Sequence, residues 1–140
     1  MSESHPTFHF ERHSITQEQI WRYAKVSGAN DPIHVDPDSA KRSRFGGTVA
    51  QGLLLYAWIS ELMMQIDADA WSAGGQIEIT FRAPAKPGDT INVCCRYLNC
   101  IERGSGIYDE YEVWCENQDQ VRVIKGRALL PTRARRAHGS

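Results

Sequence analysis

The chain has 140 residues, of which 41% are hydrophobic and 24% charged, and these are the size and composition of one folded domain rather than of a disordered chain. Its 16 lysines and arginines and 17 aspartates and glutamates give a net charge of −1, which excludes a nucleic-acid reader that depends on a basic surface. We expect a single domain over residues 1–140, with a frayed basic tail from residue 132.

The first predicted elements are a strand and a helix. Residues 7–13 are typical of a short opening strand. Thr16 is followed three residues later by Gln19, which is a capping-box pattern. A helix is therefore predicted from Thr16 to Gly28, where a glycine favours the end of a helix.

The next segment, residues 28–36, reads GANDPIHVD and is predicted to be irregular. Pro32 disfavours helical angles in the residue before it, and Asp and Asn favour turns. A short helix is predicted over residues 37–43, with proline at its first position and Asp36 as its cap. A flexible elbow, Phe45-Gly46-Gly47, follows.

Residues 49–66 read VAQGLLLYAWISELMMQI and are apolar almost all the way round a helix. Eighteen residues just reach the length of a membrane span. Gln51, Ser60 and Glu61 interrupt the run, however, and the chain that follows alternates like a sheet. We therefore predict a helix buried on all sides at the centre of the fold, and no association with a membrane.

The second half alternates between apolar and polar residues, as half-buried strands do. Four strands are predicted, over residues 76–82, 90–98, 107–115 and 121–130. The expected architecture is an α+β fold in which a mostly antiparallel sheet curls around the apolar helix. Because so short a chain has little else to cover its sheet edges, dimerisation through an edge is predicted.

The cysteines predict neither a metal site nor a disulfide framework. Cys94, Cys95, Cys100 and Cys115 form no CxxC pair and have no histidine at zinc-ligand spacing. The first 16 residues lack the apolar core of a signal peptide. We expect reduced thiols and a cytoplasmic protein.

Four segments carry a family resemblance: YAKVSGANDPIHVDPDSA at 23–40, FGGTVAQGLLL at 45–55, FRAPAKPGDTI at 81–91 and VIKGRALLP at 123–131. Their order and spacing resemble the MaoC-like dehydratase family, which includes the (R)-specific enoyl-CoA hydratases. The resemblance implies a hot-dog fold, in which a sheet wraps a long central helix, usually in a dimer. It also implies hydration of trans-2-enoyl-CoA, or dehydration of 3-hydroxyacyl thioesters. The coenzyme A thioester is then the substrate, and no metal or redox cofactor takes part.

The resemblance also implies a set of site residues. The family holds one water between an aspartate and a histidine on a loop, and His34 stands at the place of that histidine. The backbone N–H of Gly52, at the start of the central helix, is expected to polarise the thioester oxygen. Gly47, Gln51 and Leu53, from the segment FGGTVAQGLLL, are expected to bind substrate.

Three positions depart from the family pattern. The family's aspartate lies five residues before the histidine, and that position is Ala29 here. The family's asparagine is replaced by Asp31, and the histidine before Gly52 by Gln51. Either Asp31 supplies the carboxylate, since two residues of chain span less than about 7 Å, or Asp31 is a turn residue and the acid–base pair is lost.

Three functions remain open at this stage. The first is a hydro-lyase that uses Asp31, His34 and Gly52. The second, suggested by Ala29, is a non-catalytic subunit paired with a second MaoC-like chain, in place of a homodimer. The third is a hot-dog acyl-CoA thioesterase that uses Glu61, a carboxylate in the apolar helix whose alternative role is to face solvent or an arginine. The side chains of Arg42, Arg44, Arg82 and Lys86 either meet the phosphates of coenzyme A or are solvated surface charges.

Overall fold

The computed structural model describes residues 8–132, which form five strands and five helices. In chain order these are β1 (Phe8–Ser14), α1 (Gln17–Ser27), α2 (Pro32–Val35), α3 (Pro37–Lys41), α4 (Gly52–Ile66), α5 (Ala68–Gly74), β2 (Gln76–Phe81), β3 (Thr90–Arg103), β4 (Gly106–Glu116) and β5 (Arg122–Pro131). Thr7 and the tail beyond residue 132, for which we predicted a strand end and fraying, lie outside the described residues.

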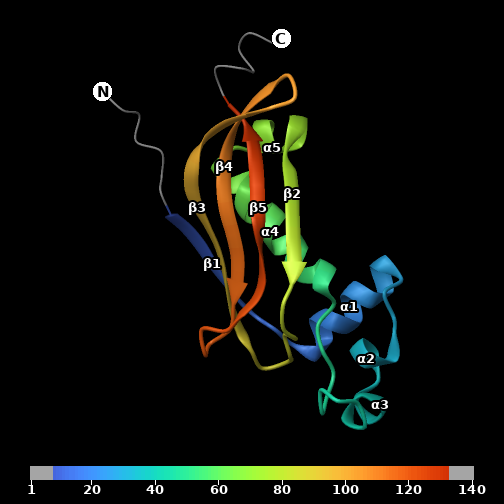
Figure 1. Ribbon diagram of the computed structural model, residues 1–140. Helices are drawn as coiled ribbons and strands as arrows, with labels where there is room; N and C mark the ends of the chain where they lie inside the picture. The colour runs from blue at the N-terminus through green and yellow to red at the C-terminus, as the bar shows by residue number, and fades with distance from the viewer. Residues whose placement is uncertain (1–7, 133–140) are drawn as a thin grey trace.

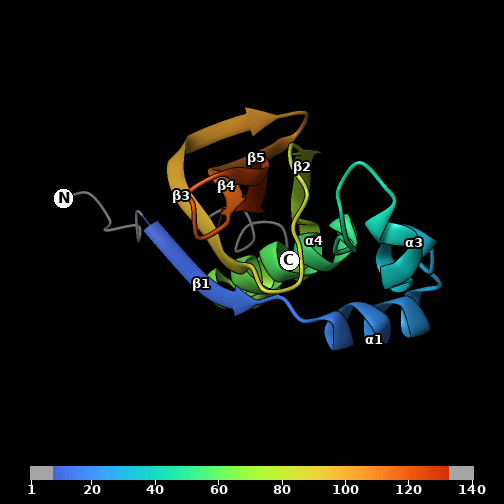
Figure 2. The ribbon, with the colours of Figure 1, turned by 90° about the horizontal axis from the view of Figure 1, so that it is seen from below.

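The strands form one antiparallel sheet in the order β1-β3-β4-β5-β2 (Figure 1). The sheet arches over α4, while α1 and α3 lie beside that helix at one end of the sheet (Figure 2). The core forms between the concave face of the sheet and one side of α4, where Ile59 and Met63 are completely buried. This arrangement confirms the predicted α+β fold with a sheet wrapped around a central helix.

The prediction that α4 is buried on all sides is wrong. Leu53 is 57% exposed and Met64 is 44% exposed. With Tyr23, Tyr56 and Glu61 they line a shallow groove on the side of α4 that faces away from the sheet. A sheet of five strands covers only one side of a helix, so an apolar helix is left with an open face.

The central helix begins at Gly52, as the expected role of its amide implied, and residues 49–51 of the apolar run lie outside the helix. The backbone N–H of Val49 donates to the carbonyl of Ile33 (3.1 Å), and that of Ala50 donates to the carbonyl of Ala85 (2.7 Å). Residues 49–51 therefore form a strap, which joins α2 to the segment after β2.

The N-terminal helices follow local sequence signals. The Thr16 and Gln19 capping box is present, and Gly28 ends α1 with a left-handed φ of 80°. Asp36 caps α3 by accepting hydrogen bonds from the N–H groups of Asp38 (3.1 Å) and Ser39 (3.2 Å), as predicted. The segment predicted to be irregular contains the short helix α2, because a proline at the first helical position needs no hydrogen-bond acceptor.

Two features of the second half were not predicted. The helix α5 forms where the Asp67 side chain accepts a hydrogen bond from Ala70 N–H (3.0 Å). The strand β3 continues to Arg103 because a bulge between Tyr97 and Asn99 restores pairing with β4. Gly104, with φ 60°, then turns the chain into β4.

The edge strand β1 turns three titratable residues toward α4, namely His9, Glu11 and His13. The His13 ring stacks on Trp58 of α4 with the ring centres 4.3 Å apart. Its Nε2 lies 3.0 Å from the Glu11 carboxylate. The inner side of this strand is therefore polar, whereas its neighbour β3 buries Ile91, Val93 and Cys95 opposite these residues. None of the helices within residues 8–132 combines the length and apolarity that a membrane crossing needs.

Candidate active site

The ring of His34 is held in one orientation by the strap. Its Nδ1 lies 2.8 Å from the carbonyl oxygen of Val49, and because a carbonyl can only accept, Nδ1 carries the proton. The neutral ring therefore has its lone pair on Nε2, which has no hydrogen-bond partner among residues 8–132. The backbone is fixed as well, since the carbonyl of His34 accepts from the Gln17 side chain at 3.0 Å.

Asp31 stands at the N-cap of α2, and its side chain is exposed. Its backbone carbonyl accepts from the N–H of His34 at 2.8 Å, so one helical turn fixes the spacing of the two residues. The Asp31 carboxylate makes no hydrogen bond to a residue that the structure describes. It therefore remains free to meet solvent or a ligand.

Gln51 joins three segments at the first turn of α4. It is 3% exposed, and its Nε2 donates to the carbonyls of Ile20 (3.0 Å) and Ala29 (3.2 Å). Two carbonyl partners settle which end of the side-chain amide carries the nitrogen. The oxygen Oε1 is buried and has no partner within residues 8–132. Two positions that depart from the family pattern, 29 and 51, are thus in direct contact, and no sequence signal predicted that contact.

The N-terminus of α4 presents two free amides. The first backbone bond of the helix runs from Leu54 N–H to the carbonyl of Gln51 at 3.0 Å. The N–H groups of Gly52 and Leu53 precede this bond and have no acceptor inside the helix. Together with the helix dipole they favour negative charge at this end.

The ring of Phe81 lies against Gly52. A Cβ added at position 52 would lie 2.8 Å from Phe81 Cζ and closer still to Cε1, far below an ordinary van der Waals contact. The glycine is therefore required for Phe81 to take this place.

A pocket of about 430 Å³ opens beside these amides. Its walls are apolar and include Leu53 and Leu55 of α4, Phe81 of β2, and Val123 and Ile124 of β5. Arg44 and Arg82 also line it. An apolar pocket with two guanidinium groups suits an amphipathic ligand that carries anionic groups.

Only some of the predicted site residues line the pocket. Gly52 and Leu53 line the pocket, whereas Asp31, His34, Gly47 and Gln51 are not among its lining residues. The link is Val49, which lines the pocket and accepts the hydrogen bond from His34. Phe81 is a pocket residue that we did not predict, although it begins the quoted segment FRAPAKPGDTI.

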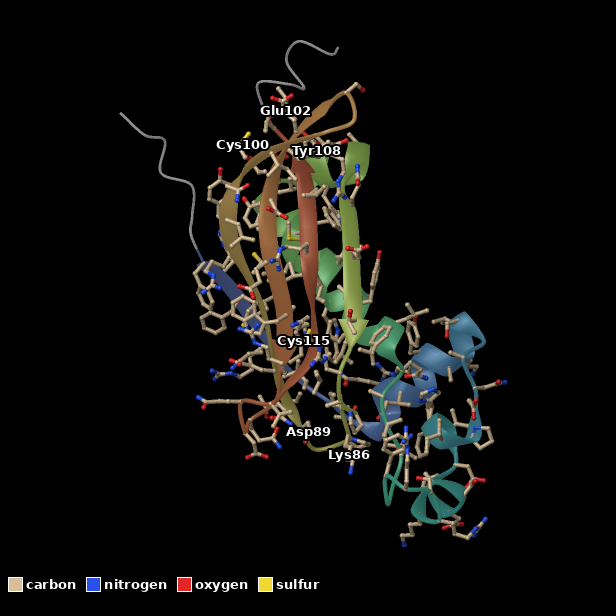
Figure 3. The ribbon with its side chains drawn as sticks, viewed as in Figure 1. Lys86, Asp89, Cys100, Glu102, Tyr108 and Cys115 are labelled. Carbon is tan, nitrogen blue, oxygen red and sulfur yellow. The ribbon has the colours of Figure 1, made fainter. Side chains whose placement is uncertain are left out.

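The other two basic residues, Arg42 and Lys86, are not among the residues that line the pocket. The Lys86 Nζ donates to the carbonyl of Phe45 at 2.8 Å, and Arg42 ends α3. Lys86 and Asp89 lie in the turn at the end of the sheet nearest α1, opposite the end that carries Cys100 and Tyr108 (Figure 3). Of the four basic residues considered, Arg44 and Arg82 line the pocket.

Two roles were left open for Glu61, and the structure places it exposed on the open face of α4. It faces solvent, which was the structural alternative.

The four cysteines are free thiols. Burial raises the pKa of Cys94 to about 11 and that of Cys95 to about 12, and burial also raises the pKa of Cys115. Within residues 8–132 no group of three or more His, Cys, Asp or Glu side chains is arranged to hold a metal ion.

Comparison with known families gives the class of the protein. Residues 3–125 match the MaoC-like domain family, so the chain belongs to that family.

One relative is a probable dehydratase from Ajellomyces capsulatus, 25% identical over 115 residues, which are 76% of this chain and 30% of that protein. Another is 3-hydroxyacyl-thioester dehydratase Z from Mycobacterium tuberculosis, 28% identical over 97 residues, which are 66% of this chain and 64% of that protein. The chain thus spans less than two thirds of the length of either relative.

Solved structures show the same fold. The (R)-hydratase from A. caviae involved in PHA biosynthesis aligns with a TM-score of 0.77 at 18% identity, covering 93% of this chain and 98% of that one. A C-terminally truncated HadBC (3R-hydroxyacyl-ACP dehydratase) complex from Mycobacterium tuberculosis aligns with a TM-score of 0.70 at 14% identity, covering 92% and 98%. The predicted hot-dog fold is confirmed by these likenesses.

Proposed function

We propose that the chain is a cytoplasmic hydro-lyase that adds water reversibly across the double bond of trans-2-enoyl-CoA to give the (R)-3-hydroxyacyl thioester. Membership of a family whose relatives include dehydratases supports the reaction class. The observation that carries the proposal is the hydrogen bond from His34 Nδ1 to the carbonyl of Val49. This bond leaves Nε2 of His34 free to act as a base. It also holds the ring against Val49, which lines the pocket.

In the proposed reaction, His34 Nε2 accepts a proton from a water molecule oriented by Asp31, as the water oxygen bonds to C3. The electron pair of the C2–C3 double bond moves toward the thioester, and negative charge develops on its carbonyl oxygen. The N–H groups of Gly52 and Leu53 stabilise that charge. The same acid–base pair then returns the proton to C2. Dehydration is the reverse sequence, and neither direction requires a metal or a redox cofactor.

The test is hydration of crotonyl-CoA, followed by the loss of enoyl absorbance. His34→Asn keeps an N–H donor for Val49 but has no base, so kcat should fall by about 10²–10⁴-fold. Asp31→Asn should lower kcat at least about tenfold, while Asp38→Asn, an exposed control on α3, should leave it unchanged. Full activity in both site variants would refute the proposed pair, and unchanged activity in EDTA would support catalysis without a metal.

A second candidate is that of a non-catalytic subunit paired with another MaoC-like chain. It is supported by Ala29, which carries no carboxylate, and by the likeness to the HadBC complex. In that case the purified chain is inactive alone and becomes active when it is co-expressed with a chain that keeps the aspartate. If the chain instead acts as a hydratase on its own, we propose that it forms a homodimer through the free edge of β2. Sedimentation of the purified chain would show whether it is a dimer.

A further inference from the structure

We infer that Phe81 determines which acyl groups the pocket accepts, because its ring closes the pocket at the Gly52 amide. This inference rests on the proposed function, since it concerns the acyl part of the same thioester substrate. It assigns a specificity-determining role to a residue outside the predicted acid–base pair.

The backbone of Phe81 is fixed, while its ring extends beyond the sheet. Phe81 pairs with Ile124 at the last position of β2. The next two N–H groups, of Arg82 and Ala83, both donate to the carbonyl of Val123, at 2.8 and 3.3 Å. By strand alternation Phe81 shares a side with Ile77 and Ile79, yet its side chain is 55% exposed while theirs are partly buried. The ring can therefore change rotamer without disturbing the ladder.

The ring stands where the reacting end of the substrate would lie. It occupies the space that a side chain at position 52 would take, directly against the residue whose amide is expected to polarise the thioester. A thioester oxygen that reaches this amide must lie beside the ring or displace it. The atoms next to the thioester, C2 and C3 and their substituents, then contact Phe81.

Besides Phe81, the pocket is lined by the apolar residues Leu55 of α4 and Ile124 of β5. In our proposal the acyl chain packs against Leu55 and Ile124, and the ring of Phe81 limits access to them. Removal of the ring enlarges the pocket at its amide end. Longer and branched acyl groups should gain relative to crotonyl, because each additional methylene in an apolar site changes discrimination by about tenfold or more.

The experiment compares wild type with Phe81→Ala, Phe81→Leu and Phe10→Ala. Phe10 is the matched control: it is 53% exposed on the outer side of β1 and does not line the pocket. Two quantities are measured over straight-chain and branched acyl groups. One is kcat/KM for the enoyl-CoAs, and the other is the Kd of the corresponding saturated acyl-CoAs by calorimetry. Thermal denaturation reports the folding of each variant.

Phe81→Ala is expected to shift the ratio of long-chain to crotonyl kcat/KM by about tenfold, with a parallel shift in Kd, while Phe10→Ala leaves both unchanged. Phe81→Leu should shift them in the same direction by less, and it replaces the alanine variant if that fails to fold. If wild type turns over enoyl-CoAs and the Phe81 profiles equal those of Phe10→Ala, the inference is wrong and the proposed function stands. If wild type binds acyl-CoAs without turnover, the hydratase proposal fails, and the Kd series alone decides the role of Phe81. If no acyl-CoA binds, both are overturned.

Discussion

The side-chain nitrogen of Gln51 lies 3.2 Å from the carbonyl oxygen of Ala29, so two positions at which the chain departs from the family resemblance form one contact. Where the family has a histidine, this chain has the amide of Gln51, which binds a backbone carbonyl. Where the family has an aspartate, this chain has the methyl group of Ala29. Neither side chain can transfer a proton at neutral pH. Among residues 28–36, the side chains that can exchange a proton are those of Asp31, His34 and Asp36, and the Asp36 carboxylate caps α3.

The first prediction concerns the position of the carboxylate. Asp31→Asn should lower crotonyl-CoA hydration at least about tenfold, and the addition of Ala29→Asp should restore most of that loss. Position 29 is half-buried beside the start of α4, and the resemblance implies a carboxylate there. Rates of the single and double variants under saturating substrate provide the measurement. Ala29→Asn with Asp31→Asn is the uncharged control, and recovery in that control would show that charge is not what matters.

The second prediction concerns Gln51, whose side chain binds the carbonyls of Ile20 and Ala29. Gln51→Glu replaces two N–H donors with a carboxylate that faces the carbonyls of Ile20 and Ala29, at a site only 3% exposed. Because an uncompensated buried charge results, the free energy of unfolding should fall by about 3–5 kcal/mol at neutral pH. Urea denaturation measures the change, and Gln120→Glu, at an exposed position, is the control. Equal midpoints for the two variants would contradict the structure around Gln51.

The third prediction is a loss of stability at alkaline pH. Burial raises the pKa of Cys94 from 9.0 to about 11 and that of Cys95 from 9.0 to about 12. Above pH 9 the unfolded chain loses these protons while the folded chain keeps them, so the free energy of unfolding decreases from there up to about pH 12. Urea midpoints measured below and above pH 9 provide the test. Cys95→Ala should reduce the slope, whereas Cys100→Ala, at an exposed thiol, should not.

The fourth prediction separates hydration from thioester cleavage. Glu61 is exposed on the open face of α4 and does not line the pocket beside Gly52. Glu61→Gln should therefore leave both enoyl-CoA hydration and the release of free coenzyme A at their wild-type rates. A thiol reagent measures the released coenzyme A. A release that occurs in wild type and disappears in this variant would favour the thioesterase alternative over the hydratase.

Features that depend on a few neighbouring residues were predictable. The capping box at Thr16, the end of α1 at Gly28 and the Asp36 cap each arise from local hydrogen bonds or backbone geometry. The four later strands followed from alternation, because one side of each strand meets a core. The same alternation, with the long apolar helix, already predicted a sheet curled around a helix, and the family resemblance independently implied that arrangement as a hot-dog fold.

Features that depend on distant contacts were not predictable. The Gln51–Ala29 contact joins residues 22 positions apart, and no sequence period records it. The open face of α4 was missed because the apolar residues Leu53 and Met64 give the same pattern whether a sheet, a second chain or solvent lies against them. The place of Phe81 over Gly52 depends on how β2 docks beside the helix, which alternation along the strand does not specify.

The polar inner side of β1 has a consequence for how this protein associates. A strand added beyond β1 would enclose Glu11 and the histidines around it in a drier environment, which disfavours lateral growth at that margin. At the opposite margin, β2 turns Ile77 and Ile79 inward and presents unpaired backbone groups with no such obstacle. Under the proposed homodimer, we therefore expect a second chain to pair with the edge of β2 and not with that of β1.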